Sequence, residues 1–322
     1  MKTSIGRERR EQRRSRLSLG RRETLWAYAF LAVPLVFFLF LRIWPALQSF
    51  QLSLFTWHVD PAQREFIGFD YYRELMGAAR FHRAVLNTFL YTLIIVPVQL
   101  ALGLLIALLL QAVERFRPLF RAIYFSPYMT PAAAVAWVWG WMYSTNFGII
   151  NTFLIEWSIF WEELGLPWLA IDPQPFLTDP SQALPAVAAV VIWQQLGFQV
   201  VIFLAGLQGI PRTFYEAARI DGAGPWALFR FITLPLLNPV MVFSVVISSI
   251  ASLQLFDQVV NINFTNQGGP LNSTLTIALY MYQEAFGRFR MGYAAAVTVV
   301  LFALILLVTV VQLRLASRKV EY

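Results

Sequence analysis

The stretch YEAARIDGAGPWALFRFITLP, Tyr215–Pro235, is amphipathic and separates two strongly apolar segments of the chain. At its start, Thr213 and Glu216 have the Thr-x-x-Glu spacing of a capping box, which predicts that a short helix begins there. The helix should end at Asp221 and Gly222, because glycine readily adopts the left-handed conformation that closes a helix. The amphipathic helix is therefore expected to lie in water, between two apolar segments of the chain.

A second short helix is predicted directly after this turn, with Gly224 as its N-cap and Pro225 at its first helical position. Little side-chain bulk covers the backbone here, since the charged residues are separated by Ala217, Ala218, Gly222, Ala223 and Gly224. Two short helices that meet at a glycine turn make a loop suited to docking against a partner.

The composition indicates an integral membrane protein. Of the 322 residues 58% are apolar and only 13% are charged, and the mean hydropathy is +0.59, which soluble domains rarely reach. The absence of cysteine excludes disulfides, thiolate metal sites and a thiol nucleophile, and two histidines leave little for a histidine-based metal centre. We therefore expect no metal or cofactor in this chain.

The formal charge of +7 is concentrated at the N-terminus, where nine basic residues precede the first apolar segment within residues 1–22. Nucleic-acid binding could explain such a tail. A cytoplasmic anchor beside a membrane segment is the preferred interpretation, because basic residues gather on the cytoplasmic side of membrane helices.

Six membrane spans are predicted from the length of about 20 apolar residues that crosses a bilayer. They lie near residues 26–47, 85–111, 120–143, 184–208, 239–260 and 292–314. Eighteen of the 25 Lys and Arg residues then lie on one side, so both termini and the opening stretch should face the cytoplasm.

The predicted organisation follows from these spans. Residues 1–25 form a basic cytoplasmic tail and 26–83 the first membrane helix with an external segment. Residues 84–314 form the transmembrane core, and 315–322 a second cytoplasmic tail. The core includes an external segment at 144–183 and a cytoplasmic loop at 209–238.

The external segment 144–183 carries acidic residues, prolines and the aromatic residues Trp157, Trp161 and Trp168. Tryptophan prefers the headgroup level of a bilayer, so we expect helical pieces along the outer membrane surface. A contact surface for a soluble partner is a compatible alternative.

Polar residues interrupt spans four and five. Gln194 and Gln195 break span four, whereas span five carries polar residues at i, i+3, i+4 and i+7, namely Gln254, Asp257, Gln258 and Asn261. In one continuous helix these residues would share a face. Polar groups at membrane depth line a solute path, or they hold helices together by hydrogen bonds, and the pattern leaves both interpretations open.

The chemistry of these residues favours a neutral solute with many hydroxyl groups, which amides and carboxylates bind and aromatic rings such as Phe198 stack against. No rings of like charge or relays of acids and histidines point to an ion path. The sequence also lacks the GxxxxGK[ST] phosphate loop and hydrolase motifs. Energy for transport would therefore come from a partner protein, and the cytoplasmic loop is the expected site at which that partner moves this chain.

The stretch EAARIDGAGPWALFRFITLP resembles the EAA motif of permease subunits in bacterial ABC importers. The family pattern of EAA, G, I and LP is matched at every position, by Glu216, Ala217, Ala218, Gly222, Ile232, Leu234 and Pro235. Flanking segments, among them NQGGPLNSTLTIALYMYQEAF, resemble the carbohydrate-importer branch related to the maltose permease. The usual NGGP is extended here by Gln267.

This resemblance implies a type I ABC importer permease fold in the bacterial inner membrane, and a protein that is not itself an enzyme. Its implied partners are a second permease subunit, two ATPase subunits that bind ATP and Mg, and an external sugar-binding protein. The loop would couple to an ATPase subunit through Glu216, Ala217, Ala218, Asp221, Gly222 and Ala223. The sugar path would include Gln194, Gln195, Phe198, Gln254, Asp257 and Asn261.

Two other classes remain as alternatives. An ion-coupled secondary transporter would work alone and show repeats with broken helices, and no clear repeat is visible. An enzyme acting on lipid-linked sugars would need an acid pair or a metal cluster, which the sequence does not show. For Glu216, capping of its own helix and contact with a partner are both compatible with the pattern.

Overall fold

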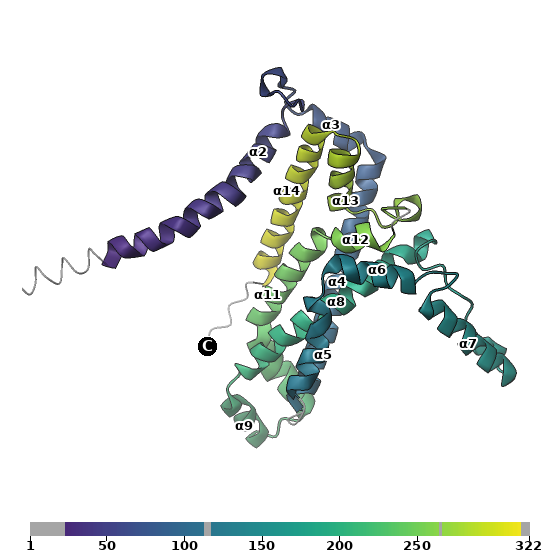
Figure 1. The fold of residues 1–322 in the computed structure, drawn as a ribbon. Coiled ribbons are helices and arrows are strands. Elements are labelled where there is room, and N and C mark those ends of the chain that lie inside the picture. The colour runs from purple at the N-terminus through teal and green to yellow at the C-terminus, as the bar shows by residue number, and fades with distance from the viewer. Residues whose placement is uncertain (1–22, 113–116, 264–265, 317–322) are drawn as a thin grey trace, which may run out of the picture.

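The computed structural model describes residues 23–112, 117–263 and 266–316, and these residues are predominantly helical (Figure 1). Within the described ranges the β-type pairing is confined to an isolated bridge between Phe55 and Phe66. The all-α prediction is therefore confirmed. The basic tail at 1–22 and the C-terminal residues 317–322 lie outside the described residues.

Five helices are long and apolar enough to cross a membrane, and they match five of the six predicted spans. They are Glu23–Leu52, α4 Ala79–Ala112, α8 Pro180–Gln208, Pro225–Leu253 and α14 Met291–Ala316. The fourth of these is a composite of α10 (Pro225–Leu228), a π-helical turn at Phe229–Thr233 and α11 (Leu234–Leu253). Span five thus begins at Pro225, fourteen residues before the predicted position.

The prediction of span three as one helix over 120–143 was wrong. The chain forms α5 (Arg117–Met129) and α6 (Ala132–Met142), with a break at Thr130 and Pro131. Pro131 has φ −54° and ψ 131°, and its ring nitrogen offers no hydrogen for a helical bond. The six-span topology therefore stays a prediction, because the described residues contain five helices of sufficient length.

The first helix lies apart from the other helices for most of its length (Figure 1). None of its most apolar 18-residue stretch is buried. A π-helical turn at Leu39–Ile43 precedes its last part, α2 (Trp44–Leu52). Only this end approaches the bundle, where the rings of Phe50 and Phe302 of α14 lie 5.9 Å apart.

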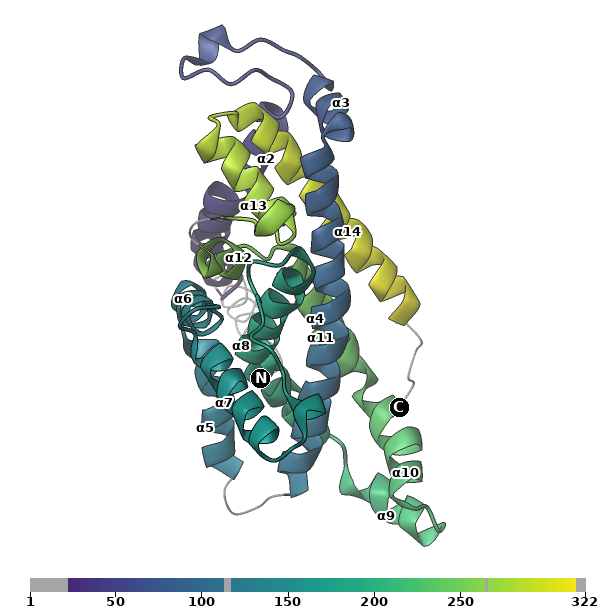
Figure 2. The same ribbon diagram turned by 90° about the vertical axis from the view of Figure 1, so that its right-hand side faces the viewer.

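The centre of the bundle is the pair α4 and α8, flanked by α5 and α11, and α14 packs on α11 (Figure 2). Small residues allow these helices to approach closely. A Cβ added to Gly103 of α4 would lie 2.7 Å from Gln199 Cβ of α8, and one added to Gly197 of α8 would run into the Tyr124 carbonyl oxygen of α5. The two glycines fix α8 against both neighbours.

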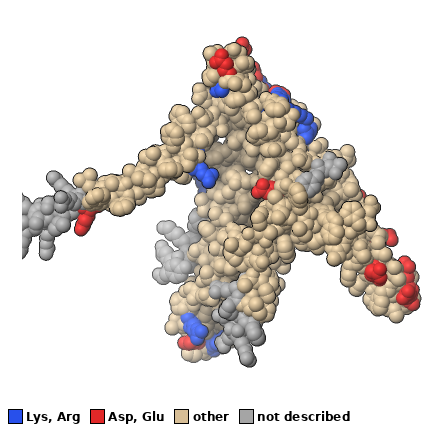
Figure 3. Space-filling view, viewed as in Figure 1, with Lys and Arg blue, Asp and Glu red and all other residues tan. Residues whose placement is uncertain are grey.

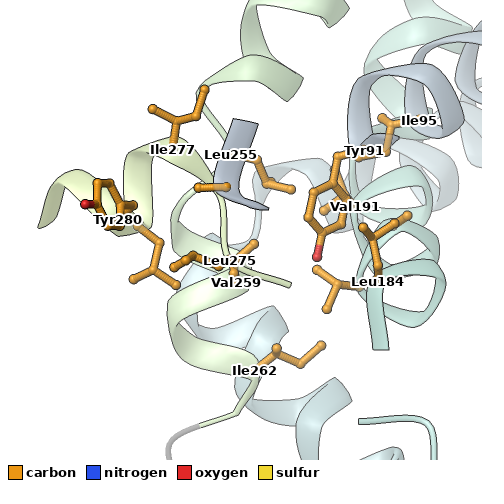
Figure 4. Packing of buried hydrophobic residues seen from close by; sticks show 14 of the residues in the cluster. Tyr91, Ile95, Leu184, Val191, Leu255, Val259, Ile262, Leu275, Ile277 and Tyr280 are labelled. Carbon is orange, nitrogen blue, oxygen red and sulfur yellow. The ribbon is translucent and has the colours of Figure 1, made fainter. Parts of the chain in front are cut away.

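The main hydrophobic core is built on the N-terminal halves of α4 and α8 (Figure 4). Tyr91 and Ile95 of α4 face Leu184 and Val191 of α8, and the short helices α12 (Asp257–Ile262) and α13 (Ile277–Tyr282) close the cluster. The two short helices are thereby held inside the bundle by apolar burial.

The segment 263–276 was predicted to be a turn-rich external loop. Its last residues are packed into the bundle, whereas Asn266, Gln267 and Leu271 are exposed. It contains a 3₁₀ turn, Pro270–Asn272, and residues from Ser273 onward are buried. The Asn87 amide of α4 donates to the carbonyl oxygens of Asn272 (2.8 Å) and Leu275 (3.0 Å). The Asn87 amide thus ties α4 to this segment, and the Asn272 carbonyl also accepts a bond from the Leu275 amide at 3.3 Å.

The first external segment folds as a small unit with a 3₁₀ turn at Pro61–Gln63 and the helix α3 (Asp70–Gly77). The end of the bundle beside α3 also holds a buried carboxylate, Glu284, in the π-helical turn Gln283–Gly287. Guanidinium groups surround it, with Arg288 at 2.5 Å, Arg290 at 3.6 Å and Arg80 at 3.9 Å. The cluster links α4 to the start of α14.

The segment 144–183 forms helical pieces, as predicted. Its long helix is α7 (Ile149–Glu163), followed by a 3₁₀ turn at Pro167–Leu169, and α7 projects away from the bundle (Figure 1). Asp179 then caps α8 by accepting a hydrogen bond from the Ser181 amide at 2.7 Å. The Ser181 hydroxyl also donates to this carboxylate and lowers the pKa of Asp179 below its ordinary value.

Charged side chains gather at the two ends of the bundle and on the tip of α7, with few between them (Figure 3). An uncharged belt between charged ends is the surface expected of a protein that spans a bilayer.

Candidate functional site

A chain of buried amides runs through the middle of the bundle. Gln194 of α8 is only 4% exposed, and its Nε2 donates to the Thr130 carbonyl oxygen at 3.0 Å. Its Oε1 accepts a hydrogen bond from Gln258 Nε2 of α12 at 2.9 Å. The amide of Gln194 therefore satisfies the carbonyl at the α5–α6 break, and the broken helix is tolerated because a neighbouring helix supplies the partner.

A second pair of amides lies next to these buried glutamines. Gln99 of α4 is fully buried, and its Nε2 lies 3.4 Å from Gln195 Oε1 and 3.5 Å from the Val191 carbonyl oxygen. The two successive glutamines of α8 thus have different neighbours, one toward α5 and α12 and the other toward α4. For Gln194, the hydrogen-bonding role that the sequence left open is confirmed.

Predicted span five is broken where the sequence placed a polar stripe. Helix α11 ends at Leu253, Phe256 has φ −137° and ψ −59°, and α12 begins at Asp257. The Leu255 carbonyl oxygen in this break accepts a hydrogen bond from Thr276 Oγ1 at 2.8 Å. A side chain 21 residues away replaces the helical bond, so the prediction of one continuous polar face was wrong.

The break lines a cavity of about 550 Å³ between α5, α8, α11 and α12, which we call the inner cavity. This volume is in the range of small-molecule sites. Its lining side chains are Tyr128, Met129, Thr130, Ala132, Gln194, Gln195, Ala251, Gln254, Leu255, Phe256, Asp257 and Gln258. Amide, carboxylate and phenol groups offer both donors and acceptors to a polyhydroxy solute.

Four of the six predicted path residues line the inner cavity: Gln194, Gln195, Gln254 and Asp257. Phe198 lies behind the lining, with its ring stacked on Tyr128 at 5.2 Å. Asn261 points elsewhere, because its Nδ2 donates to the Asp257 carbonyl oxygen at 2.7 Å and its Oδ1 accepts from Trp137 Nε1 at 3.3 Å. Asp257 and Gln258 belong to the same helix α12 and line the cavity, so it is the two hydrogen bonds of the Asn261 amide that hold it away from the lining.

The sequence analysis did not identify Tyr128 and Thr130 as cavity residues. Both lie in the run SPYMTP, residues 126–131, whose two prolines and hydroxyl groups interrupt an otherwise apolar segment. This interruption is the signal that could have identified them, because irregular backbone at membrane depth is found where it lines a cavity or is buried in protein.

The loop 209–238 contains helix α9 (Arg212–Ile220), which projects at the end of the molecule opposite α3 (Figures 1 and 2). The predicted C-terminus is confirmed, since Asp221 is the C-cap and Gly222 has φ +84°. The Ala223 amide donates to the Ala218 carbonyl oxygen at 2.9 Å and the Gly222 amide to Arg219 at 3.1 Å. This pair of bonds is a Schellman closure.

The predicted capping box was wrong. The N-cap of α9 is Pro211, with no side-chain capping bond, and Thr213 is the second helical residue. Pro211 lacks an N–H and cannot continue α8, so the new helix starts one residue after it, before Thr213 could act as a cap. Glu216 then lies in the middle of the helix and is exposed. Self-capping is therefore excluded as its role.

The second predicted helix begins where expected, with Gly224 as N-cap and Pro225 at the first position. It was not short, because it continues through the π-helical turn into α11. The half-buried face of α9 contacts this helix, because the Tyr215 hydroxyl lies 3.1 Å from Thr233 Oγ1. The opposite face is uncovered. Ile220 is 86% exposed, and nothing lies within 4 Å of a Cβ added to Gly222.

A polar cavity held by buried amides within a bundle of apolar helices is the construction of a membrane transport subunit. Residues 75–321 match the family described as binding-protein-dependent transport system inner membrane component. The chain belongs to this family.

Comparison with individual proteins shows which members of this family the chain is similar to. It is 32% identical over 300 residues to the lactose transport system permease protein LacF of Rhizobium radiobacter, covering 92% of this chain and 95% of that protein. It is 33% identical over 304 residues to the sulfoquinovosyl glycerol transport system permease protein SmoG of Agrobacterium fabrum, covering 94% and 93%. The predicted resemblance to permease subunits of bacterial ABC sugar importers is confirmed, as is a multi-pass protein of the inner membrane.

A solved structure has the same fold. A chain of a bacterial ABC transporter involved in the import of the acidic polysaccharide alginate superposes with a TM-score of 0.78, over 95% of this chain and 100% of that chain, at 23% identity. The relatives are permease subunits rather than enzymes.

Proposed function

We propose that this chain is the sugar-translocating subunit of an ATP-driven importer and that α9 receives the movement from an ATPase subunit. One observation carries the proposal: α9 is fixed to the bundle on one face and uncovered on the other. Tyr215 anchors it beside Thr233, whereas Ile220 and the Gly222 turn project from the end of the molecule. An apolar side chain presented on a fixed helix suits docking into a groove.

The residues proposed to contact the ATPase subunit are Glu216, Ala217, Ala218, Asp221, Gly222 and Ala223. Their backbone is accessible because the side chains of the three alanines are small, and the Schellman closure keeps the turn rigid. Movement of α9 would pass directly to the inner cavity, since the loop connects α8 with the helix Pro225–Leu253, and both line that cavity.

The inner cavity is the proposed sugar path, with Gln194, Gln195, Gln254 and Asp257 as polar contacts. Its amides and single carboxylate can pair with hydroxyl groups in either direction. Three characterised relatives are named for lactose, sulfoquinovosyl glycerol and sn-glycerol-3-phosphate transport. These compounds are polyhydroxylated, which supports a sugar or related polyol delivered by an external binding protein.

The complete importer is proposed to contain a second permease subunit and two ATPase subunits, on which ATP and Mg are bound. Both termini and α9 are then cytoplasmic. The chain has no native cysteine, so single-cysteine variants can test this arrangement without background labelling.

The experiment is site-specific crosslinking in membranes that contain the whole transporter. Ile220→Cys should crosslink to an ATPase subunit, because the uncovered tip of α9 would lie in its docking groove. Val59→Cys, whose native side chain is 85% exposed in the first external segment, should not. Absence of an ATPase adduct from Ile220→Cys, with the transporter intact, would exclude α9 as the coupling element.

An ion-coupled secondary transporter is the second candidate. The observation that favours it is the pair of broken helices beside the inner cavity, at Thr130–Pro131 and Gln254–Phe256, since such breaks are common at ion and substrate sites of carriers. A requirement for ATP separates the two classes, because a carrier would need only an ion gradient.

A further inference from the structure

A second cavity of about 500 Å³ lies between α6, the turn that follows it and the end of α12. We call it the outer cavity, because its walls include the start and end of the segment 144–183 that the sequence places outside. We propose that it is an outer sugar subsite and that the transported substrate is an oligosaccharide spanning both cavities. The inference rests on the proposed function and names its substrate class.

Aromatic side chains form the walls of the outer cavity. Trp137 and Trp141 of α6 are 56% and 58% exposed, and Phe147 in the following turn is 62% exposed. The rings of Trp141 and Phe147 are 6.5 Å apart and inclined at 43°. Uncovered aromatic faces at an angle present two surfaces on which the apolar faces of sugar rings can pack.

The polar groups of this cavity are neutral. Hydroxyls come from Ser144, Thr145 and Thr178, and amides from Asn146 and Asn263. None of the described residues that line it is charged. Neutral donors and acceptors beside aromatic faces fit hydroxyl groups better than phosphate, carboxylate or ammonium groups, which would be buried without a counter-ion.

The walls are fixed by backbone contacts. A Cβ added to Gly140 of α6 would run into the carbonyl oxygen of Ile262, so the backbones of α6 and α12 touch at the floor. The buried Asn151 amide donates to the carbonyl oxygens of Ser144 (3.3 Å) and Gln174 (3.0 Å), which ties the two ends of the segment together. A preformed site loses less entropy when it binds a ligand.

The two cavities adjoin along the same pair of helices. Helix α6 contributes Ala132 to the inner cavity and Gly140 to the outer one, and α12 contributes Asp257 to the inner and Ile262 to the outer. At a rise of about 1.5 Å per residue, these separations are roughly 12 Å and 8 Å, about the length of two to three linked sugar rings.

The test is protection of single cysteines from maleimide labelling in the complete transporter in lipid nanodiscs. Met129→Cys reports the inner cavity and Thr178→Cys the outer one, while Val59→Cys is a control outside both. The probes are the neutral sugars glucose and lactose and the glucose oligomers maltotriose and maltopentaose.

At least one probe of two or more rings should protect both cavity positions, and glucose should not protect Thr178→Cys. In the Thr178→Cys background, Trp141→Ala should raise the half-protecting concentration about tenfold through loss of stacking, whereas Trp141→Phe should retain most of the protection. Trp168→Ala, which removes an exposed tryptophan outside the cavity lining, should have no effect.

The outcomes separate the two proposals. Protection of Met129→Cys alone overturns the outer subsite and leaves the sugar path standing, as does unchanged protection in Trp141→Ala. Failure of every sugar to protect either position overturns the sugar path and the outer subsite together.

Discussion

Replacing Ile220 by alanine at the tip of α9 should weaken the association with the ATPase subunits while leaving the bundle intact. The substitution removes three side-chain carbons, worth about 2.4 kcal/mol at about 0.8 kcal/mol per buried carbon. Because 86% of the residue is uncovered in the free chain, almost all of this burial remains for a partner to supply, about 2 kcal/mol. That value corresponds to a roughly 30-fold higher Kd.

The assay is titration of the detergent-solubilised permease pair with purified ATPase subunits, followed by sugar-stimulated ATP hydrolysis. Val59→Ala is the matched control, because Val59 is also a β-branched residue, 85% exposed, and lies in the first external segment. Its Kd should equal that of the native chain. An Ile220→Ala variant that binds within about twofold of the native affinity would refute the reasoning, since α9 would then bury no apolar surface on the ATPase.

Three further sets of substitutions test the coupling turn, the inner cavity and the helix packing. Gly222→Asp should abolish sugar-stimulated ATP hydrolysis while the chain stays in the membrane, because the new side chain can meet only a partner. Gly222→Asn should have the same effect, and asparagine tolerates the left-handed backbone at this position. Normal coupling in both variants would contradict the docking assignment. Asp257→Ala and Gln254→Ala should each reduce sugar uptake about tenfold with basal ATPase assembly intact, through loss of a hydrogen bond worth about 1 to 1.5 kcal/mol; unchanged uptake in both would move the path elsewhere. Gly197→Ala should lower the free energy of unfolding by about 1 to 3 kcal/mol, because the new Cβ meets the α5 backbone. Gly77→Ala is the control and should not lower it, because there is open space around Gly77. Equal stability of the two variants would argue against the close α5–α8 contact.

Local features of the chain were predictable because their causes are local. The end of α9 follows from the left-handed conformation of Gly222, and the start of the next helix from Gly224 and Pro225. Apolar length alone located the five long helices. Hydropathy did not place the start of span five, because Pro225–Leu228 is amphipathic and continues the helix beyond the apolar segment.

Distant side chains stabilise both helix breaks, and of the two breaks the first has a local signal in the sequence, Pro131. The carbonyl of Thr130 is satisfied by Gln194, 64 residues away, and that of Leu255 by Thr276. A sequence pattern shows the polar residues but not which carbonyl each one reaches. The bond from Trp137 holds the Asn261 amide away from the inner cavity, and the spacing in the sequence does not reveal this contact.

The predicted capping box failed for a local reason that the pattern did not include. Pro211 starts a new helix directly after itself, and this places Thr213 inside α9. Glu216 is consequently available to a partner, whereas the sequence alone could not separate partner contact from self-capping.

The central claim is that this permease translocates sugar with energy that reaches it through α9 from ATPase subunits. The most direct measurement is sugar uptake into proteoliposomes that contain the purified transporter, with ATP inside and the external binding protein outside. Uptake should require both, should persist when ion gradients are collapsed, and should be lost when Ile220 and Gly222 are substituted together. Uptake by this chain alone, driven by an ion gradient without ATP, would contradict the account.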